Sequence, residues 1–185
     1  VIVTSGALGD IFGRRRIFLA GLALFVVSCV FIAFAATGWM VVLGRVVQGA
    51  AGSTILACGL SLLSVATSGQ AQMRAVALWG AAAAAGAAAG PVVGGVLDQT
   101  LGWQGLFWVD AVVAALCVPL TMRGVAESRD TQRSGTVDML GTVLIAGMLV
   151  PLVFAMTEGP SWGWLSGPTL LCLALTVVAG IGFVA

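Results

Sequence analysis

Three polar side chains lie inside long apolar stretches of this sequence, where their types and spacing could support chemistry. Arg45 and Gln48 are three residues apart, which places them on one side of a helix, while Asp110 belongs to a separate stretch. Small residues continue the side of the helix that carries Arg45, namely Gly49, Gly52 and Gly59. Because a charge in apolar surroundings needs a partner or water, we expect Arg45 and Asp110 to share a water-filled cavity. Asp110 is then either the charge partner of Arg45 or a carboxylate that binds and releases a proton.

The composition excludes most soluble functions. Of the 185 residues, 60% are hydrophobic and 8% are charged, whereas about 25% of residues are charged in an ordinary soluble domain. Eight basic residues, all of them Arg, and seven acidic residues leave a net charge of +1, and there is no His. So few charges cannot cover a soluble surface, and the lack of His removes Ser-His-Asp sites and most zinc sites. The near-neutral balance also argues against a nucleic-acid partner. We therefore expect an integral membrane protein with no catalytic residue, metal or cofactor.

The cysteines carry no sign of a metal site or a disulfide framework. They lie far apart, each within an apolar stretch, and no two of them form a C-x-x-C pair. We interpret them as small apolar packing residues: Cys29, Cys58, Cys117 and Cys172.

The apolar stretches have the lengths of membrane-spanning helices, because a bilayer core about 30 Å thick needs roughly 20 residues of helix. The expected spans are Ile17–Ala36, Met40–Ala66, Ala75–Leu97, Leu106–Met122, Met139–Thr157 and the truncated Thr169–Ala185. Val1–Leu8 is interpreted as the end of an earlier span, and the chain as a fragment of a longer polypeptide. These lengths suit helices rather than barrel strands, so the predicted fold class is an all-α, polytopic transmembrane helix bundle.

The arginines predict the orientation of these spans. Seven of the eight lie in alternate connections, which are residues 9–16, 67–74 and 123–138. The other connections hold none, and these are residues 37–39, 98–105 and 158–168. The positive-inside rule therefore places the first set in the cytoplasm. Five of the six Trp lie at the opposite ends of the spans, where an interfacial aromatic belt is expected.

The first connection, GALGDIFGRRRIF, resembles the signature between the second and third helices of the major facilitator superfamily. The matching positions are Gly6, Leu8, Asp10, Gly13, Arg14 and Arg15. Gly13 permits a tight reversal between helices, and Asp10 can meet a helix N-terminus or an arginine. The resemblance implies a cytoplasmic gate. The alternative is that the arginines serve only as a topology signal.

Two further stretches resemble motifs of the antiporters in this superfamily. Arg45, Gln48 and Gly49 match a fourth-helix motif that is associated with proton coupling. A fifth-helix motif that uptake members usually lack is matched by Gly86, Gly90, Pro91, Gly94 and Gly95. Proline removes one backbone hydrogen bond, so we expect a bend at this position. The alternatives are that Arg45 snorkels outward to the headgroups and that the glycines serve ordinary helix packing.

The segment GWQGLFWVD resembles the start of the sixth helix in the fourteen-span drug:proton antiporter branch. It departs from that pattern at Gln104 and Gly105, which replace Arg-Trp, and at Asp110, where Asn is usual. The short connection 123–138 also resembles this branch, since twelve-span members have a longer central loop. The resemblance implies that residues 1–122 belong to the N-terminal six-helix bundle and residues 139–185 form two linker helices, the second truncated. The C-terminal bundle of the same chain would lie beyond them.

The resemblance implies a secondary active transporter rather than an enzyme. It would export lipophilic or cationic drugs or metabolites across the cytoplasmic membrane by alternating access, driven by protons. Arg45, Gln48 and Asp110 would serve proton coupling. The expected partners are protons, a lipophilic small molecule and the lipid bilayer. The alternatives are an uptake symporter of the same superfamily, an exporter of an endogenous antibiotic, and a non-transporting membrane scaffold or sensor.

Overall fold

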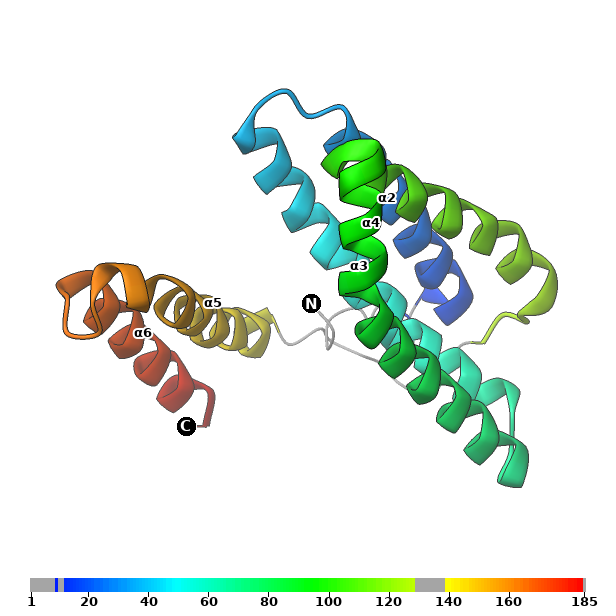
Figure 1. The fold of residues 1–185 in the computed structure, drawn as a ribbon. Helices are drawn as coiled ribbons and strands as arrows, with labels where there is room; N and C mark the ends of the chain where they lie inside the picture. Colours follow the sequence, from blue (N-terminus) through cyan, green and yellow to red (C-terminus); the bar gives the residue numbers. More distant parts are fainter. Residues whose placement is uncertain (1–8, 10–11, 129–138, 185) are drawn as a thin grey trace. The chain divides into compact units, whose positions relative to one another are not determined.

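The computed structural model shows a helical chain, and it describes residue 9 and residues 12–128 and 139–184. The helices are α2 (Arg14–Ala33), α3 (Gly38–Ala66), α4 (Gly69–Gly124), α5 (Met139–Trp162) and α6 (Gly167–Val184). Within the described residues there is no β-strand (Figure 1). The all-α prediction is therefore confirmed.

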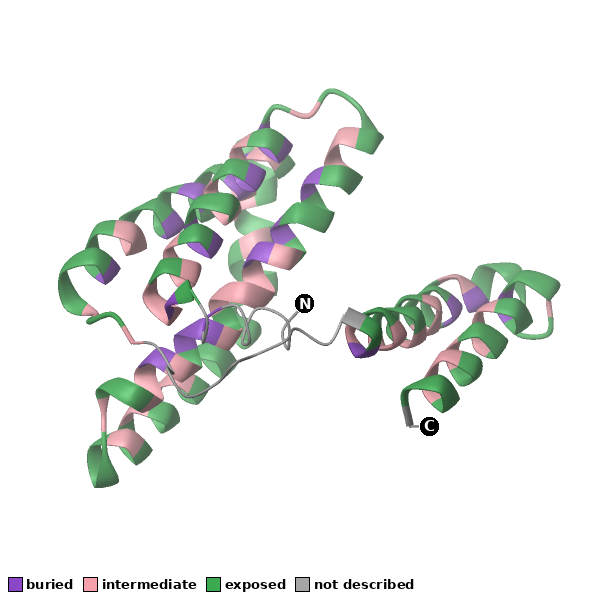
Figure 2. Cartoon of the chain, turned by 180° about the vertical axis from the view of Figure 1, so that it is seen from behind, coloured by how far each residue is buried: buried purple, intermediate pink, exposed green. Residues whose placement is uncertain are grey.

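The lengths and composition of these helices suit a membrane. The helices long and apolar enough to cross a bilayer are Arg14–Ala33, Gly38–Ala66, Gly69–Gly124 and Leu140–Trp162, and Gly167–Phe183 is a shorter apolar helix. Large hydrophobic side chains are exposed along every helix, and Figure 2 shows buried residues only as narrow strips. Contiguous apolar surface of this extent is foreign to soluble proteins, so the chain is a multi-pass membrane protein.

Two expected spans are joined in the single helix α4, which has 56 residues. Its backbone leaves the helical region only at Gly102, where φ is 72° and ψ is 170°. Glycine adopts a positive φ without strain, so it is the residue at which the chain can reverse. In Figure 1 the first part of α4 (green) runs up to this break, and the second part (yellow-green) turns back down from it. The reversal falls within the predicted connection 98–105, but the residues on both sides of Gly102 are helical, so the two predicted spans end too early.

The remaining helix ends also extend past the apolar stretches. Helix α3 begins at Gly38, α4 begins at Gly69, and α5 continues beyond Thr157 to Trp162. A helix of 29 residues such as α3 is about 44 Å long at 1.5 Å per residue, longer than the hydrocarbon core. Such a helix is longer than the apolar stretch needed to cross the bilayer.

The chain divides into two compact units, Val1–Gly135 and Thr136–Ala185. In the first unit α2 packs against both α3 and α4. The core of this unit combines residues of α2 with residues after the break in α4: Cys29, Ile32, Ala33, Phe107 and Ala111. Helices α2 and α3 approach closely at Gly44, where a β-carbon would collide with the side chain of Ile32. Small residues at such crossings let two helices come near each other in lipid.

In the second unit α5 packs against α6. Gly163, with φ of 90°, makes the turn between them. Thr169 is fully buried, and its hydroxyl donates to the carbonyl of Gly163 at 3.0 Å. The ring of Trp164 lies against Gly159, where a β-carbon would be 3.0 Å from it. The Trp-Gly-Trp segment thus forms a packed turn.

Candidate functional site

Arg45 lies in α3 and its side chain is directed toward α4. Its Nη1 donates to Oε1 of Gln48 at 3.0 Å. Its Cζ lies 4.7 Å from the centroid of the Phe107 ring, which belongs to α4. A guanidinium over an aromatic face is attracted by the ring quadrupole. Arg45 is exposed, yet its guanidinium has two partners, Gln48 on its own helix and Phe107 on α4.

Gln48 connects Arg45 to the core. It is 6% exposed, and its Nε2 donates to Sγ of Cys29 at 3.0 Å. Cys29, in α2, is fully buried. A buried amide is costly unless both its ends are hydrogen-bonded, and here one end serves Arg45 while the other serves Cys29. The packing role predicted for Cys29 is therefore incomplete, because its sulfur is also a hydrogen-bond acceptor.

Asp110 lies on α4, one helical turn after Phe107, and is exposed. It is within electrostatic range of Arg45. Among the described residues, however, no ion pair joins these two side chains. The structure brings the predicted residues Arg45, Gln48 and Asp110 to one region, where α3 faces α4. Whether Asp110 acts as a charge partner or as a proton carrier stays a prediction.

The glycines on the Arg45 side of α3 divide into two kinds. Gly59 is buried, and a β-carbon there would lie 2.7 Å from Cη2 of Trp79. At Gly49 and Gly52 a β-carbon would meet nothing within 4 Å. Only Gly59 therefore supports helix packing within the chain as described.

The glycine-proline motif in the first half of α4 stands apart from this site. A β-carbon at Gly86, Gly90 or Gly95 would meet nothing within 4 Å, and one at Gly94 would only touch Leu106, at 4.0 Å. The backbone keeps helical angles through Pro91. The expected bend at this proline stays a prediction.

A second candidate site lies where α2 begins. Gly13 precedes the helix with φ of 105°, and a β-carbon there would lie 2.7 Å from Oε1 of Glu127. Oε1 of Glu127 accepts a hydrogen bond from the backbone N–H of Arg15 at 3.1 Å. Its Oε2 lies 3.8 Å from Nε of Arg16. The segment after α4 thus closes over the turn before α2. Gly6 and Asp10 lie outside the described residues.

Further bonds fasten the same two segments together. The backbone N–H of Arg14 donates to the carbonyl of Ser128 at 3.0 Å. Nη2 of Arg15 donates to the carbonyl of Met122 in the last turns of α4. Arginines at a helix N-terminus oppose the helix dipole, and a carboxylate placed there compensates them. Glu127 supplies that carboxylate, which the motif itself did not predict.

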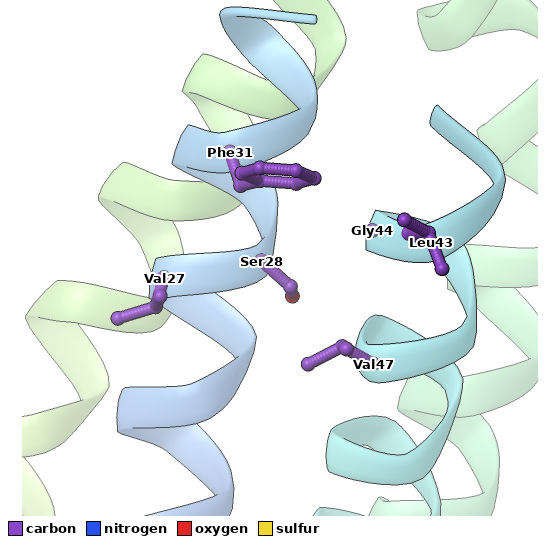
Figure 3. Close-up of a pocket in the computed structure, with 6 residues that line it drawn as sticks. All are labelled: Val27, Ser28, Phe31, Leu43, Gly44 and Val47. Carbon is purple, nitrogen blue, oxygen red and sulfur yellow. The ribbon is translucent and has the colours of Figure 1, made fainter. Parts of the chain in front are cut away.

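A cavity of about 250 Å³ lies between α2 and α3. Its lining is Val27, Ser28, Phe31, Leu43, Gly44 and Val47 (Figure 3). The hydroxyl of Ser28 is engaged, because it donates to the carbonyl of Phe25 at 2.7 Å. The cavity therefore offers an apolar surface.

Residues that sequence reasoning missed complete both sites. Cys29, Phe107 and Glu127 lie far along the chain from the residues that they contact. The one available signal was the acid Glu127 near the end of a predicted span, in a connection that also carries arginines.

Apolar helices of membrane-spanning length, an arginine within one of them and an arginine-rich turn are together the features of a multi-pass membrane protein. A family model described as Major Facilitator Superfamily matches residues 1–185. The chain belongs to this superfamily.

Several similar proteins carry names related to drug resistance. The tetracenomycin C resistance and export protein of Streptomyces glaucescens is 33% identical over 182 residues, covering 98% of this chain and 34% of that protein. The methylenomycin A resistance protein of Bacillus subtilis (strain 168) is 34% identical over 184 residues, which cover 99% of this chain and 39% of that protein. The multidrug efflux pump LfrA of Mycolicibacterium smegmatis is 34% identical over 185 residues, which cover 100% of this chain and 36% of that protein. The chain therefore spans between 34% and 39% of the length of these relatives.

Proposed function

We propose that the protein of which this chain is part exports lipophilic or cationic small molecules across the cytoplasmic membrane. Protons moving inward drive this export by alternating access. The names of the relatives, which refer to resistance, export and efflux, support this direction of transport. The observation that carries the proposal is that the exposed side chain of Arg45 is held against α4 by Gln48 and by the ring of Phe107. An arginine within an apolar helix is retained at a cost, so we assign it to ion movement.

The geometry supports a division of labour between the two charged residues. Arg45 stays charged at every physiological pH, whereas a carboxylate within electrostatic range of it can exchange its proton. We propose that Asp110 binds a proton from the outer side and releases it to the cytoplasm as the bundle rocks. Arg45 and Gln48 then respond to the change of charge on Asp110. No ion pair between Arg45 and Asp110 is needed for this coupling.

The remaining motifs are assigned by the same proposal. Gly6, Asp10, Gly13, Arg14 and Arg15 form the cytoplasmic gate. Gly86, Gly90, Pro91, Gly94 and Gly95 form the flexible face of an antiporter helix. We further propose membership of the fourteen-span branch. Residues 1–122 then belong to the N-terminal bundle, 123–138 form a cytoplasmic loop and 139–185 form linker helices.

Drug-driven proton flux in vesicles tests the proposal. The full-length protein is placed in phospholipid vesicles with a pH-sensitive dye, and ethidium is added as the transported cation. We expect proton movement coupled to ethidium in the wild type, and its loss in Asp110→Asn. Asp98→Asn is the matched control, because Asp98 lies on the same helix near the break at Gly102 and is exposed. Full coupling in Asp110→Asn would exclude the proton-carrier role.

A second candidate function is export of an antibiotic that the host itself makes. It is favoured by relatives named for resistance to tetracenomycin C and methylenomycin A. Both functions use the same site and differ in substrate range. A panel of unrelated dyes distinguishes them, since a dedicated exporter moves one chemical class and a multidrug exporter moves several. An uptake symporter would instead raise the amount of substrate inside cells.

A further inference from the structure

The amide of Gln48 has a single orientation that satisfies both of its neighbours. Oε1 faces the donor Nη1 of Arg45, and Nε2 faces the sulfur of Cys29. Turning the amide over would place its NH2 group against the guanidinium, which has donors only. The sulfur at the other end accepts a hydrogen bond from Nε2, so this orientation gives both Oε1 and Nε2 of the buried amide a partner.

Phe107 supports the other side of the guanidinium. It is 4% exposed, and Trp103 packs against it edge-on with ring centroids 6.1 Å apart. Phe107 and Cys29 belong to the same core cluster. Arg45 is therefore held by Gln48, which is bonded to Cys29, and by the ring of Phe107. Cys29 and Phe107 pack in the same core, so the two contacts of Arg45 rest on one cluster.

We propose that Cys29, acting through Gln48, and Phe107 are positioning residues that hold Arg45 toward the Asp110 side of α4. The inference rests on the proposed function, in which Arg45 takes part in proton coupling. Arginine cannot lose its proton in a protein, so the guanidinium can affect Asp110 only through its position. Supports on α2 and α4 make that position depend on how these helices pack. A shift of α2 relative to α4 would therefore move the guanidinium of Arg45 and change the electrostatic potential at Asp110.

Cysteine variants of the full-length protein test the proposal. Cys29→Val keeps an apolar side chain and removes the sulfur acceptor, whereas Cys29→Ser keeps an acceptor. We expect ethidium-driven proton flux to fall about three- to tenfold in Cys29→Val, as for one lost hydrogen bond. We also expect its pH profile to shift, and Cys29→Ser to restore both. Cys117→Val is the matched control, since Cys117 is another cysteine of the bundle but lies outside the core cluster.

A chemical readout that does not depend on transport accompanies the flux. Phenylglyoxal modifies arginine, and the rate at Arg45 is followed by mass spectrometry of its peptide. We expect faster modification in Cys29→Val and in Phe107→Leu than in the wild type, Cys29→Ser or Cys117→Val. Cys29→Ala serves as the second apolar variant if Cys29→Val does not fold.

The outcomes separate the inference from the proposed function. Modification of Arg45 at the wild-type rate in both Cys29→Val and Phe107→Leu would overturn the positioning role. So would a flux and pH profile of Cys29→Val that match those of Cys117→Val. Absence of ethidium-driven proton flux in the wild type would overturn the proposed function, while the modification rates would still decide the positioning of Arg45.

Discussion

The two halves of α4 differ sharply in what surrounds them. All the buried residues of this helix follow the break at Gly102, and they are Gly105, Phe107, Ala111, Ala114 and Thr121. The residues from 80 to 93 before the break are nearly all exposed, and most of them are Ala or Gly (Figure 2). Alanine and glycine bury little apolar area, so their value lies in allowing close approach of a partner. The difference shows that α4 contributes to the packed core only after the break, whereas its first half presents an exposed surface of small residues.

The largest expected effect is at a packed helix crossing, in contrast to the exposed first half of α4. Gly44→Val forces a side chain into Ile32 at the crossing of α2 and α3. Overpacking of this kind costs about 1–3 kcal/mol. We expect a lower unfolding midpoint of the purified full-length protein in denaturing detergent. Gly38→Val is the matched control, because a β-carbon at Gly38 meets nothing within 4 Å. Equal midpoints for the two variants would contradict the close helix crossing.

The next prediction concerns the open half of α4. Gly90→Leu places a branched side chain on the glycine face, where the described chain offers no contact within 4 Å. If another helix of the whole protein packs there, the variant loses about tenfold in ethidium export, corresponding to 1.4 kcal/mol of blocked packing. Export is measured as dye loss from cells that express the full-length protein. Wild-type export would instead indicate that the glycine face contacts lipid.

The smallest expected effect lies at the turn before α2. Glu127→Gln removes the carboxylate from the helix N-terminus while keeping an acceptor for the N–H of Arg15. A charge at a helix terminus contributes about 0.3–1 kcal/mol. We therefore expect a Tm lower by roughly 1–3 °C, by differential scanning fluorimetry. Because charges are screened by salt, the difference should shrink at high ionic strength. A difference that is independent of salt would contradict an electrostatic role for Glu127.

The sequence predicted the features that depend on local spacing. Arg45 and Gln48 share a helix side because they are three residues apart, and the structure bonds them directly. Composition and stretch length likewise predicted an all-helical membrane chain. The glycine turn at Gly13 was also expected, and its φ of 105° is one that glycine adopts freely.

Features that depend on tertiary contact could not be predicted in the same way. Glu127 is 112 residues from Arg15, and Cys29 is 19 residues from Gln48. No spacing rule relates such pairs, because only the packing of helices brings them together. Helix ends were misplaced for a different reason. Polar residues such as Asp98 and Glu158 set the predicted ends of the spans, whereas the helices end at Gly102 and near Gly163, where the backbone itself turns.

The most direct test of the account is ethidium-driven proton flux by Arg45 variants of the full-length protein in vesicles. We expect Arg45→Leu to abolish the flux, because it removes the charge that faces α4. Arg45→Lys keeps the charge but loses the planar stacking on Phe107, so we expect partial activity. A flux in Arg45→Leu equal to that of the wild type would contradict the central claim that Arg45 serves proton coupling.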